Sequence, residues 1–180
     1  MEKVECEIEV KSPADKFWEG LKDSTTIFPK IFSHRFKSIE IVEGDGTSAG
    51  TVRLLTYVEG TPFITFAKEK VELVDDENKI LGYSVIDGEL TTLFKTLKVS
   101  LQVVPKGEGE VEVQVQVEGK DEGEGKGEGE VEGKGEGSLV KWCMAFERAN
   151  EDVTIDPHHL KENATKAFTG LDAYLVAITV

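Results

Sequence analysis

The succession of strand-type segments constrains the fold of this chain more than any other feature. Six segments between residues 36 and 148 have the apolar alternation and β-branched residues of strands, and turn residues or one glycine-rich segment separate them. Strands that follow one another without long crossovers pair antiparallel. The sequence therefore predicts an antiparallel sheet. In chain order the six segments are 36–43, 51–57, 63–74, 79–86, 92–104 and 138–148.

One further strand and three helices surround this series. Residues 3–10 alternate between apolar and charged side chains, which is typical of a strand with one buried face. Ser12 as N-cap and Pro13 at the first helical position predict a helix directly afterwards, and a second short helix is expected over 26–32. The last helix, 158–178, has apolar residues at helical spacing. We expect an α+β fold in which a curved antiparallel sheet wraps the long helix and leaves a space beside it.

Residues 107–137 differ in composition from the rest of the chain. They include 11 acidic residues, 3 lysines and 10 glycines, and they carry more than half of the whole chain's net charge of −14. Such a segment has too little apolar surface to offset the entropy cost of ordering. We therefore expect a single domain over residues 1–180, interrupted at 107–137 by an exposed, mobile, low-complexity insert. A basic protein partner for this acidic loop is one possible role.

Charge and hydropathy exclude several classes of function. The net charge of −14 argues against a nucleic-acid partner, because phosphate binding favours a basic face. No run approaches the roughly 18 apolar residues of a membrane span, and the charged, alternating first residues do not resemble a signal peptide, so we expect none. We therefore expect a cytoplasmic protein without stable membrane insertion. Adjacent His158 and His159 point to different faces of a helix and lack an evident third ligand, so neither a metal nor another cofactor is expected.

The glycine-bearing segment 44–50 superficially resembles a nucleotide-binding fingerprint. Its pattern is G-x-G-x-x-x-G, and the residues after it are typical of a strand. A phosphate site of that kind requires the N-terminus of a helix at this position. The segment is therefore interpreted as a turn between two strands whose glycines adopt positive φ.

Several segments, in this order and spacing, resemble the plant major latex protein-like proteins of the birch-pollen-allergen superfamily, which also includes the class-ten pathogenesis-related proteins. The resemblance covers essentially the whole chain except 107–137. It implies a helix-grip fold, in which a seven-stranded antiparallel sheet and two short helices enclose a large apolar cavity under a long C-terminal helix. The segments are Thr26-Ile27-Phe28-Pro29-Lys30, 43–51, Tyr83-Ser84-Val85-Ile86-Asp87-Gly88, Ser138-Leu139-Val140-Lys141-Trp142, Asn150-Glu151-Asp152 and Asp156-Pro157-His158.

The resemblance also implies a function. Members of the family are described as binders of small hydrophobic molecules, linked to defence and stress, and a minority are enzymes. We therefore expect binding or transport of a small hydrophobic plant metabolite or hormone-like ligand. The alternative is an enzyme on the same scaffold, of the cyclase, isomerase or condensing type, for which no catalytic residues are assigned. Condensing relatives use a Lys, a Glu and a Tyr, and no cavity lysine is evident here.

Alternation along the strands predicts which side chains face inward, and the last helix adds two more. Most could simply fill a core, but polar members such as Arg53 and Tyr83 in an apolar space are typical of ligand pockets. Arg53 either binds a carboxylate or enolate or forms a salt bridge with Glu69 at the rim. The candidate ligand-binding residues are Arg53, Leu55, Tyr57, Phe66, Tyr83, Val85, Leu97, Val99, Trp142, Met144, Asn163 and Ala167.

Overall fold

A computed structural model of the chain describes residues 1–106 and 137–178, and it contains a seven-stranded antiparallel sheet. The sheet order is β1-β7-β6-β5-β4-β3-β2. The first strand, β1, therefore pairs with the last, β7, and β1 and β2 form the two edges of the sheet. This confirms the predicted antiparallel sheet. The strands are β1 Glu2–Val10, β2 Phe36–Glu43, β3 Val52–Tyr57, β4 Phe66–Asp75, β5 Ile80–Gly88, β6 Phe94–Pro105 and β7 Ser138–Arg148.

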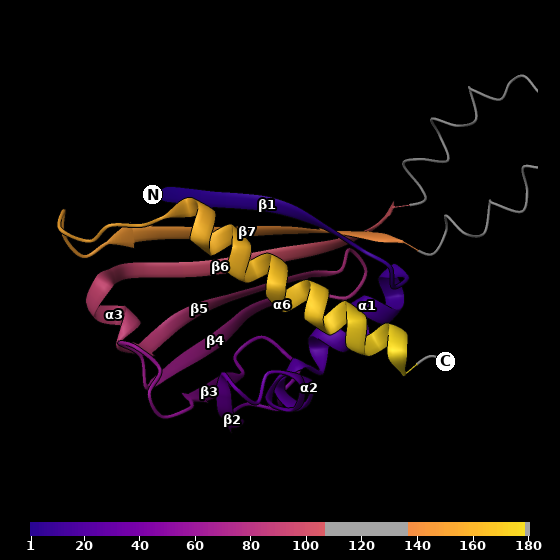
Figure 1. Ribbon diagram of the computed structural model, residues 1–180, viewed down its shortest axis with the longest axis horizontal. Coiled ribbons are helices and arrows are strands. Elements are labelled where there is room, and N and C mark those ends of the chain that lie inside the picture. The colour runs from indigo at the N-terminus through magenta and orange to yellow at the C-terminus, as the bar shows by residue number, and fades with distance from the viewer. Residues whose placement is uncertain (107–136, 179–180) are drawn as a thin grey trace, which may run out of the picture.

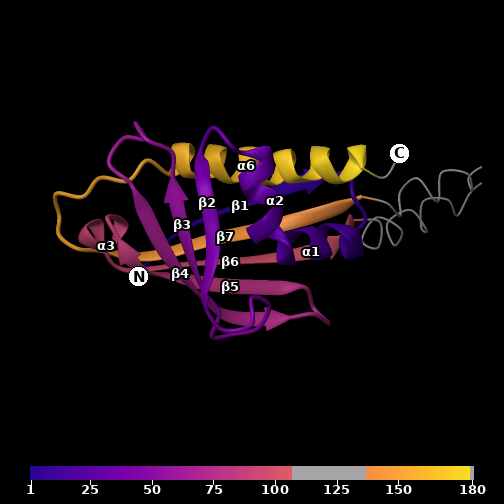
Figure 2. The same ribbon diagram turned by 90° about the horizontal axis from the view of Figure 1, so that it is seen from below.

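The long helix α6 (Pro157–Ala177) lies obliquely across one face of the sheet (Figure 1). Two consecutive short helices, α1 (Ala14–Lys22) and α2 (Ser24–Ile31), lie beside the C-terminal half of α6, and the sheet curves around all three (Figure 2). The predicted helix-grip arrangement is therefore confirmed. A one-turn helix, α3 (Leu90–Leu93), was not predicted. In the part of the chain that the structure describes, no helix is both long and apolar enough to cross a membrane.

The proposed insert at 107–137 falls almost wholly on residues 107–136, which lie outside the described ones. Its exposure, its mobility and its place within one domain therefore stay predictions.

The main core lies between the concave face of the sheet and helices α1 and α6. Alternation along β1 buries Val4, Ile8 and Val10 and leaves its glutamates exposed. These side chains meet Phe17 of α1 and Leu171 of α6, both of which are fully buried. The core thus fixes α6 against β1.

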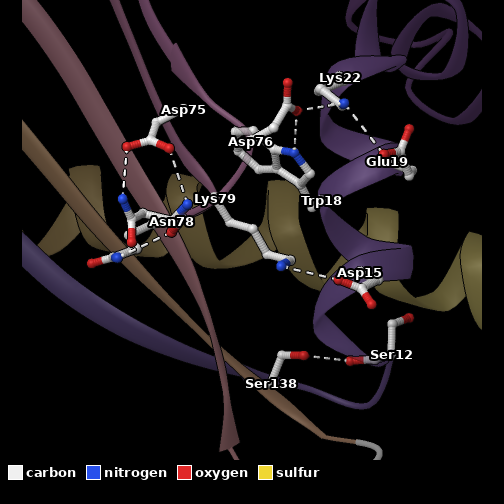
Figure 3. A network of polar contacts seen from close by, with 11 residues as sticks. Ser12, Asp15, Trp18, Glu19, Lys22, Asp75, Asp76, Asn78, Lys79 and Ser138 are labelled. Atoms are coloured by element: carbon white, nitrogen blue, oxygen red, sulfur yellow. Dashed lines mark hydrogen bonds and ion pairs between the residues drawn. The ribbon is translucent and has the colours of Figure 1, made fainter.

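The link between β1 and α1 differs from the prediction. Pro13 is the N-cap of α1, with no side-chain cap, and Ser12 instead donates its hydroxyl to Asp172 Oδ1 of α6 at 2.7 Å. The backbone N–H groups of Lys11 and Ser12 donate to the same carboxylate at 2.8 and 2.9 Å. Ser138 of β7 donates its hydroxyl to the Ser12 carbonyl at 2.6 Å (Figure 3). Ser12 therefore connects three elements rather than capping one.

A polar cluster attaches α1 to the turn between β4 and β5 (Figure 3). Asp76 accepts hydrogen bonds from Trp18 Nε1 at 2.8 Å and from Lys22 Nζ at 2.6 Å. Lys79 forms an ion pair with Asp15 at 3.0 Å. These contacts hold α1 over one end of the sheet.

The glycine-bearing segment is a turn between strands, as predicted. Gly44, Gly46 and Gly50 all have positive φ, and β3 follows directly. A Cβ on Gly44 would lie 2.7 Å from Cα of Thr51, so a side chain has no room there. Asp45 accepts hydrogen bonds from residues 47 and 48 within the turn, and these bonds lower the pKa of its carboxyl. The glycines therefore allow the backbone conformation of the turn.

Acid should weaken the fold partly through Glu89, which precedes α3. Its carboxylate accepts hydrogen bonds from the Thr65 hydroxyl at 2.5 Å and the Thr65 amide at 2.9 Å, which lower the pKa of Glu89 from 4.5 to about 2. A folded-state pKa below the unfolded one gives stability that is present above pH 4.5 and is lost as the pH falls toward about 2. Urea unfolding at about pH 5 and about pH 2.5 should therefore show a smaller acid-induced loss in Glu89→Gln than in the wild type. Glu151→Gln, at an exposed position, is the control; equal losses in wild type and Glu89→Gln would contradict the prediction.

Candidate ligand-binding cavity

A cavity of about 260 Å³ lies between the concave face of the sheet and helices α1, α2 and α6. Most of its lining is apolar, and a smaller polar group interrupts it. The apolar residues are Leu21, Phe28, Phe32, Phe36, Ile39, Leu55, Leu81, Leu101, Trp142, Leu160, Ala164, Ala167 and Phe168. The polar residues are Ser24, Arg35, Arg53, Tyr57, Glu69, Tyr83 and Asn163. This composition matches that of small-molecule sites, which combine an apolar wall with a few placed polar groups.

A larger hollow of about 710 Å³ lies between α1 and the glycine turn, but it is a weaker candidate. Its walls are mostly polar or charged, and they include Glu19, Lys22 and Asp76. Lys22 already pairs with both Glu19 and Asp76, at 3.2 and 2.6 Å. Among the described residues, the hollow therefore has little apolar wall, and its one lysine is already paired.

Two features of the sequence create the space in the smaller cavity. Alternation along β3 brings Arg53, Leu55 and Tyr57 to the concave face of the sheet. On the facing side of α6, Ala164 and Ala167 present only methyl groups. Small side chains on the helix opposite large ones on the sheet leave a volume that neither fills.

Seven of the twelve sequence-predicted site residues line this cavity. They are Arg53, Leu55, Tyr57, Tyr83, Trp142, Asn163 and Ala167. The structure places the other five elsewhere: Phe66, Val85, Leu97, Val99 and Met144.

Strand register and core packing explain the five exceptions. Phe66 pairs with Thr56, the neighbour of Leu55 and Tyr57, and therefore faces away from the cavity. Leu97, Val99 and Met144 face inward, but they are buried in the core. Val85 pairs with Glu69 and packs against that core without reaching the cavity wall.

Sequence reasoning missed the aromatic wall contributed by α2 and the start of β2. Phe28 and Phe32 meet edge to face with ring centroids 5.3 Å apart, and Phe36 lies 5.3 Å from Tyr57. The spacing of four residues between Phe28, Phe32 and Phe36 is a signal that could have drawn attention to them. Because α2 ends at Ile31 and Phe36 begins a strand, however, the spacing does not mark one helix face.

A charged pair forms the centre of the polar group. Arg53 Nη2 lies 2.6 Å from Glu69 Oε1, and the two side chains are only 12% and 13% exposed. The salt bridge considered from the sequence therefore exists, but it lies in the cavity wall rather than at an exposed rim. Arg53 Nη1 lies 3.4 Å from the Ser24 hydroxyl, and the guanidinium carbon lies 5.3 Å from the centre of the Tyr83 ring. Arg53 Nε is buried and has no hydrogen-bond partner in the described part of the chain.

Burial shifts the pKa values of the neighbouring groups. It raises the pKa of the Glu69 carboxyl above its ordinary value, although Arg53 acts in the opposite direction. Burial, with a smaller effect of the Glu69 charge, raises the pKa of Tyr57 to about 12 and also raises that of Tyr83. Both phenols are therefore protonated at neutral pH and can donate hydrogen bonds. Within residues 1–106 and 137–178, no cluster of His, Cys, Asp or Glu is suited to a metal ion.

Comparison with known proteins shows the family. The sequence matches the pathogenesis-related protein Bet v 1 family over residues 1–131. This chain belongs to the Bet v 1 family. MLP-like protein 423 of Arabidopsis thaliana is 38% identical to it over 176 residues, which cover 98% of this chain and 95% of the relative. The resemblance to major latex protein-like proteins is therefore confirmed, and with it membership of a family whose members bind hydrophobic ligands.

Solved structures of other proteins show the same fold. The crystal structure of ginseng major latex-like protein 151 from Panax ginseng has a TM-score of 0.70 at 22% identity, with 96% of each chain covered. A point mutant of norcoclaurine synthase from Thalictrum flavum, in complex with a transition-state analogue, also has a TM-score of 0.70, at 20% identity and with 99% of this chain and 96% of the other covered. At these identities the likeness concerns the fold alone.

Proposed function

We propose that this Bet v 1 protein binds and carries a small hydrophobic plant metabolite or hormone-like molecule in the cavity under α6. The observation that supports the proposal is the mostly apolar cavity wall, in which the buried pair of Arg53 and Glu69 forms the centre of a smaller polar group. Removing an apolar ligand from water contributes about 25 cal/mol per Å² of surface buried. The polar group supplies orientation.

Prodan (propionyl-dimethylaminonaphthalene), an uncharged fluorophore whose emission shifts to the blue in apolar surroundings, tests this proposal. Its emission should shift on titration and saturate with a Kd in the micromolar range, about −8 kcal/mol. Leu73 is a large apolar residue that is 48% exposed, so a Leu73→Ser variant is the control for binding outside the cavity. An unchanged titration in Leu73→Ser supports the cavity site. No saturable shift in the wild type would refute the proposal.

Several finer features belong to the same proposal. We also propose that the protein acts in the cytoplasm and in defence or stress, as the resemblance to major latex protein-like proteins implies. The net charge of −14 disfavours nucleic acid as a partner. A basic protein that binds the acidic segment 107–137 remains part of the proposal, and that segment lies almost entirely outside the described residues.

An enzyme on the same scaffold is the second candidate, and one observation favours it. Glu69 is a carboxyl group with a raised pKa in the wall of an apolar cavity, which is the environment of many general bases. The condensing type is disfavoured, because no lysine is among the described residues that line the cavity. Recovering the ketone probe after prolonged incubation in D2O, and measuring the deuterium beside its carbonyl, separates the two candidates. An unaltered probe indicates a carrier, and exchange of the protons beside its carbonyl indicates a catalyst.

A further inference from the structure

We propose that the cavity selects an uncharged ligand that presents a carbonyl oxygen to Arg53, and that Glu69 excludes carboxylates from the same position. This inference rests on the proposed binding function and specifies the chemical class of the ligand. It follows from the charge balance, the hydrogen-bonding capacity and the size of the cavity.

The charge of Arg53 is already balanced. Its Nη2 lies 2.6 Å from Glu69 Oε1, and the two residues occupy opposed positions on β3 and β4. Neighbouring strands hold both partners, so Glu69 stays beside any group that reaches the guanidinium. A ligand carboxylate there would place two negative charges around one positive charge. In a poorly hydrated site their repulsion is large.

Arg35 is the other cation among the described residues that line the cavity, and its position leaves the charge balance at Arg53 unchanged. It is exposed, and its guanidinium lies over the Phe36 ring at 5.3 Å. Solvent screens an exposed charge much more than a buried one. Arg35 therefore offers an anion a weak site at the mouth of the cavity and leaves the inner position to Arg53.

The inner polar group retains hydrogen-bond donors. A guanidinium has five N–H donors, and Arg53 uses them for one short bond to Glu69 and one long contact of 3.4 Å to Ser24. Its buried Nε has no partner among the residues that the structure describes. The Tyr57 and Tyr83 phenols, protonated at neutral pH, lie in the same wall. A group rich in donors is matched by an acceptor oxygen, and an uncharged carbonyl supplies one without a second negative charge.

The cavity volume limits the size of the ligand. About 260 Å³ lies just below the range of roughly 300–1,000 Å³ that is typical of small-molecule sites. The cavity therefore suits a molecule of two or three rings with its carbonyl at one end. A naphthalene ketone has this size and shape.

A matched pair of fluorophores tests the inference. Prodan carries a ketone on a dimethylaminonaphthalene ring, and dimethylaminonaphthoate carries a carboxylate at the corresponding position. The wild type should bind prodan at least about tenfold more tightly than the naphthoate. Glu69→Gln should strengthen naphthoate binding at least about tenfold, so that the ratio of prodan affinity to naphthoate affinity falls below its wild-type value. Arg53→Lys keeps the positive charge but removes the planar guanidinium with its fixed set of N–H donors. It should weaken prodan binding about tenfold.

Glu59→Gln makes the same chemical change at an exposed position and is the control for net charge. Thermal melts establish that each variant is folded. If prodan fails to bind the wild type, the proposed function itself fails. If prodan and the naphthoate bind equally well and Glu69→Gln changes neither, the selectivity is refuted while the binding function stands. If Glu69→Gln does not fold, the ketone-to-carboxylate ratio in the wild type and the effect of Arg53→Lys still decide the question.

Discussion

Replacing Asp172 with alanine is expected to lower the free energy of unfolding by about 3 kcal/mol. The carboxylate is 7% exposed and accepts three hydrogen bonds, from the Lys11 amide, the Ser12 amide and the Ser12 hydroxyl. The alanine variant leaves these donors without an acceptor in a poorly hydrated place. For a chain of this length the loss corresponds to a fall of roughly 6–12 °C in Tm. Urea unfolding and a thermal melt at neutral pH measure both quantities.

Two variants make this test specific. Ser12→Ala removes only the hydroxyl donor and should cost about 1 kcal/mol. Glu162→Ala removes a carboxylate from an exposed position on the same helix and should change the stability by less than about 0.5 kcal/mol. A loss below about 1 kcal/mol in Asp172→Ala would show that the contact between α6 and the β1–α1 link contributes little.

Local patterns were sufficient to predict the architecture. Alternation identified all seven strands, and the apolar period of the last helix predicted α6 to within one residue at each end. These patterns are local consequences of burying one face. The link at Ser12 was not predictable in the same way, because its partner Asp172 is 160 residues away. From the sequence, a serine before a proline is also consistent with a helix N-cap. The tertiary contact with Asp172 determines that Ser12 does not have that role.

The cavity was only partly predictable, for reasons that differ between residues. Alternation correctly indicated that Arg53 and Tyr83 face inward, because their strands are regular at those positions. It could not distinguish Leu97 in the core from Leu101 on the cavity wall, since both face inward on β6. That difference depends on where α6 crosses the sheet. Phe66 was misplaced because alternation alone does not fix which set of side chains faces the cavity, and the pairing of Phe66 with Thr56 sets its face.

The pairing of Arg53 with Glu69 shows that burial changes what a salt bridge can contribute to a binding site. From the sequence, a salt bridge at the rim and an inward cation for an anionic ligand were separate alternatives. The structure combines parts of both, because the pair is formed and also lines the cavity. A buried pair neutralises the charge that would attract an anion, yet it leaves donors on the guanidinium. The polar group is therefore better suited to orienting a neutral molecule than to capturing a charged one.

Filling the cavity from α6 should abolish binding without unfolding the protein. Ala167→Phe places a ring in a space of about 260 Å³, and the ring occupies much of the volume that a two-ring ligand requires. Prodan affinity should fall at least about 100-fold, or about 2.7 kcal/mol, while Tm stays unchanged or rises because an apolar void is filled. Thr165→Phe is the matched control, since it makes a similar change at an exposed position of the same helix. If both variants bound prodan as well as the wild type, the probe would have to occupy some other surface, and the cavity would lose its assigned role.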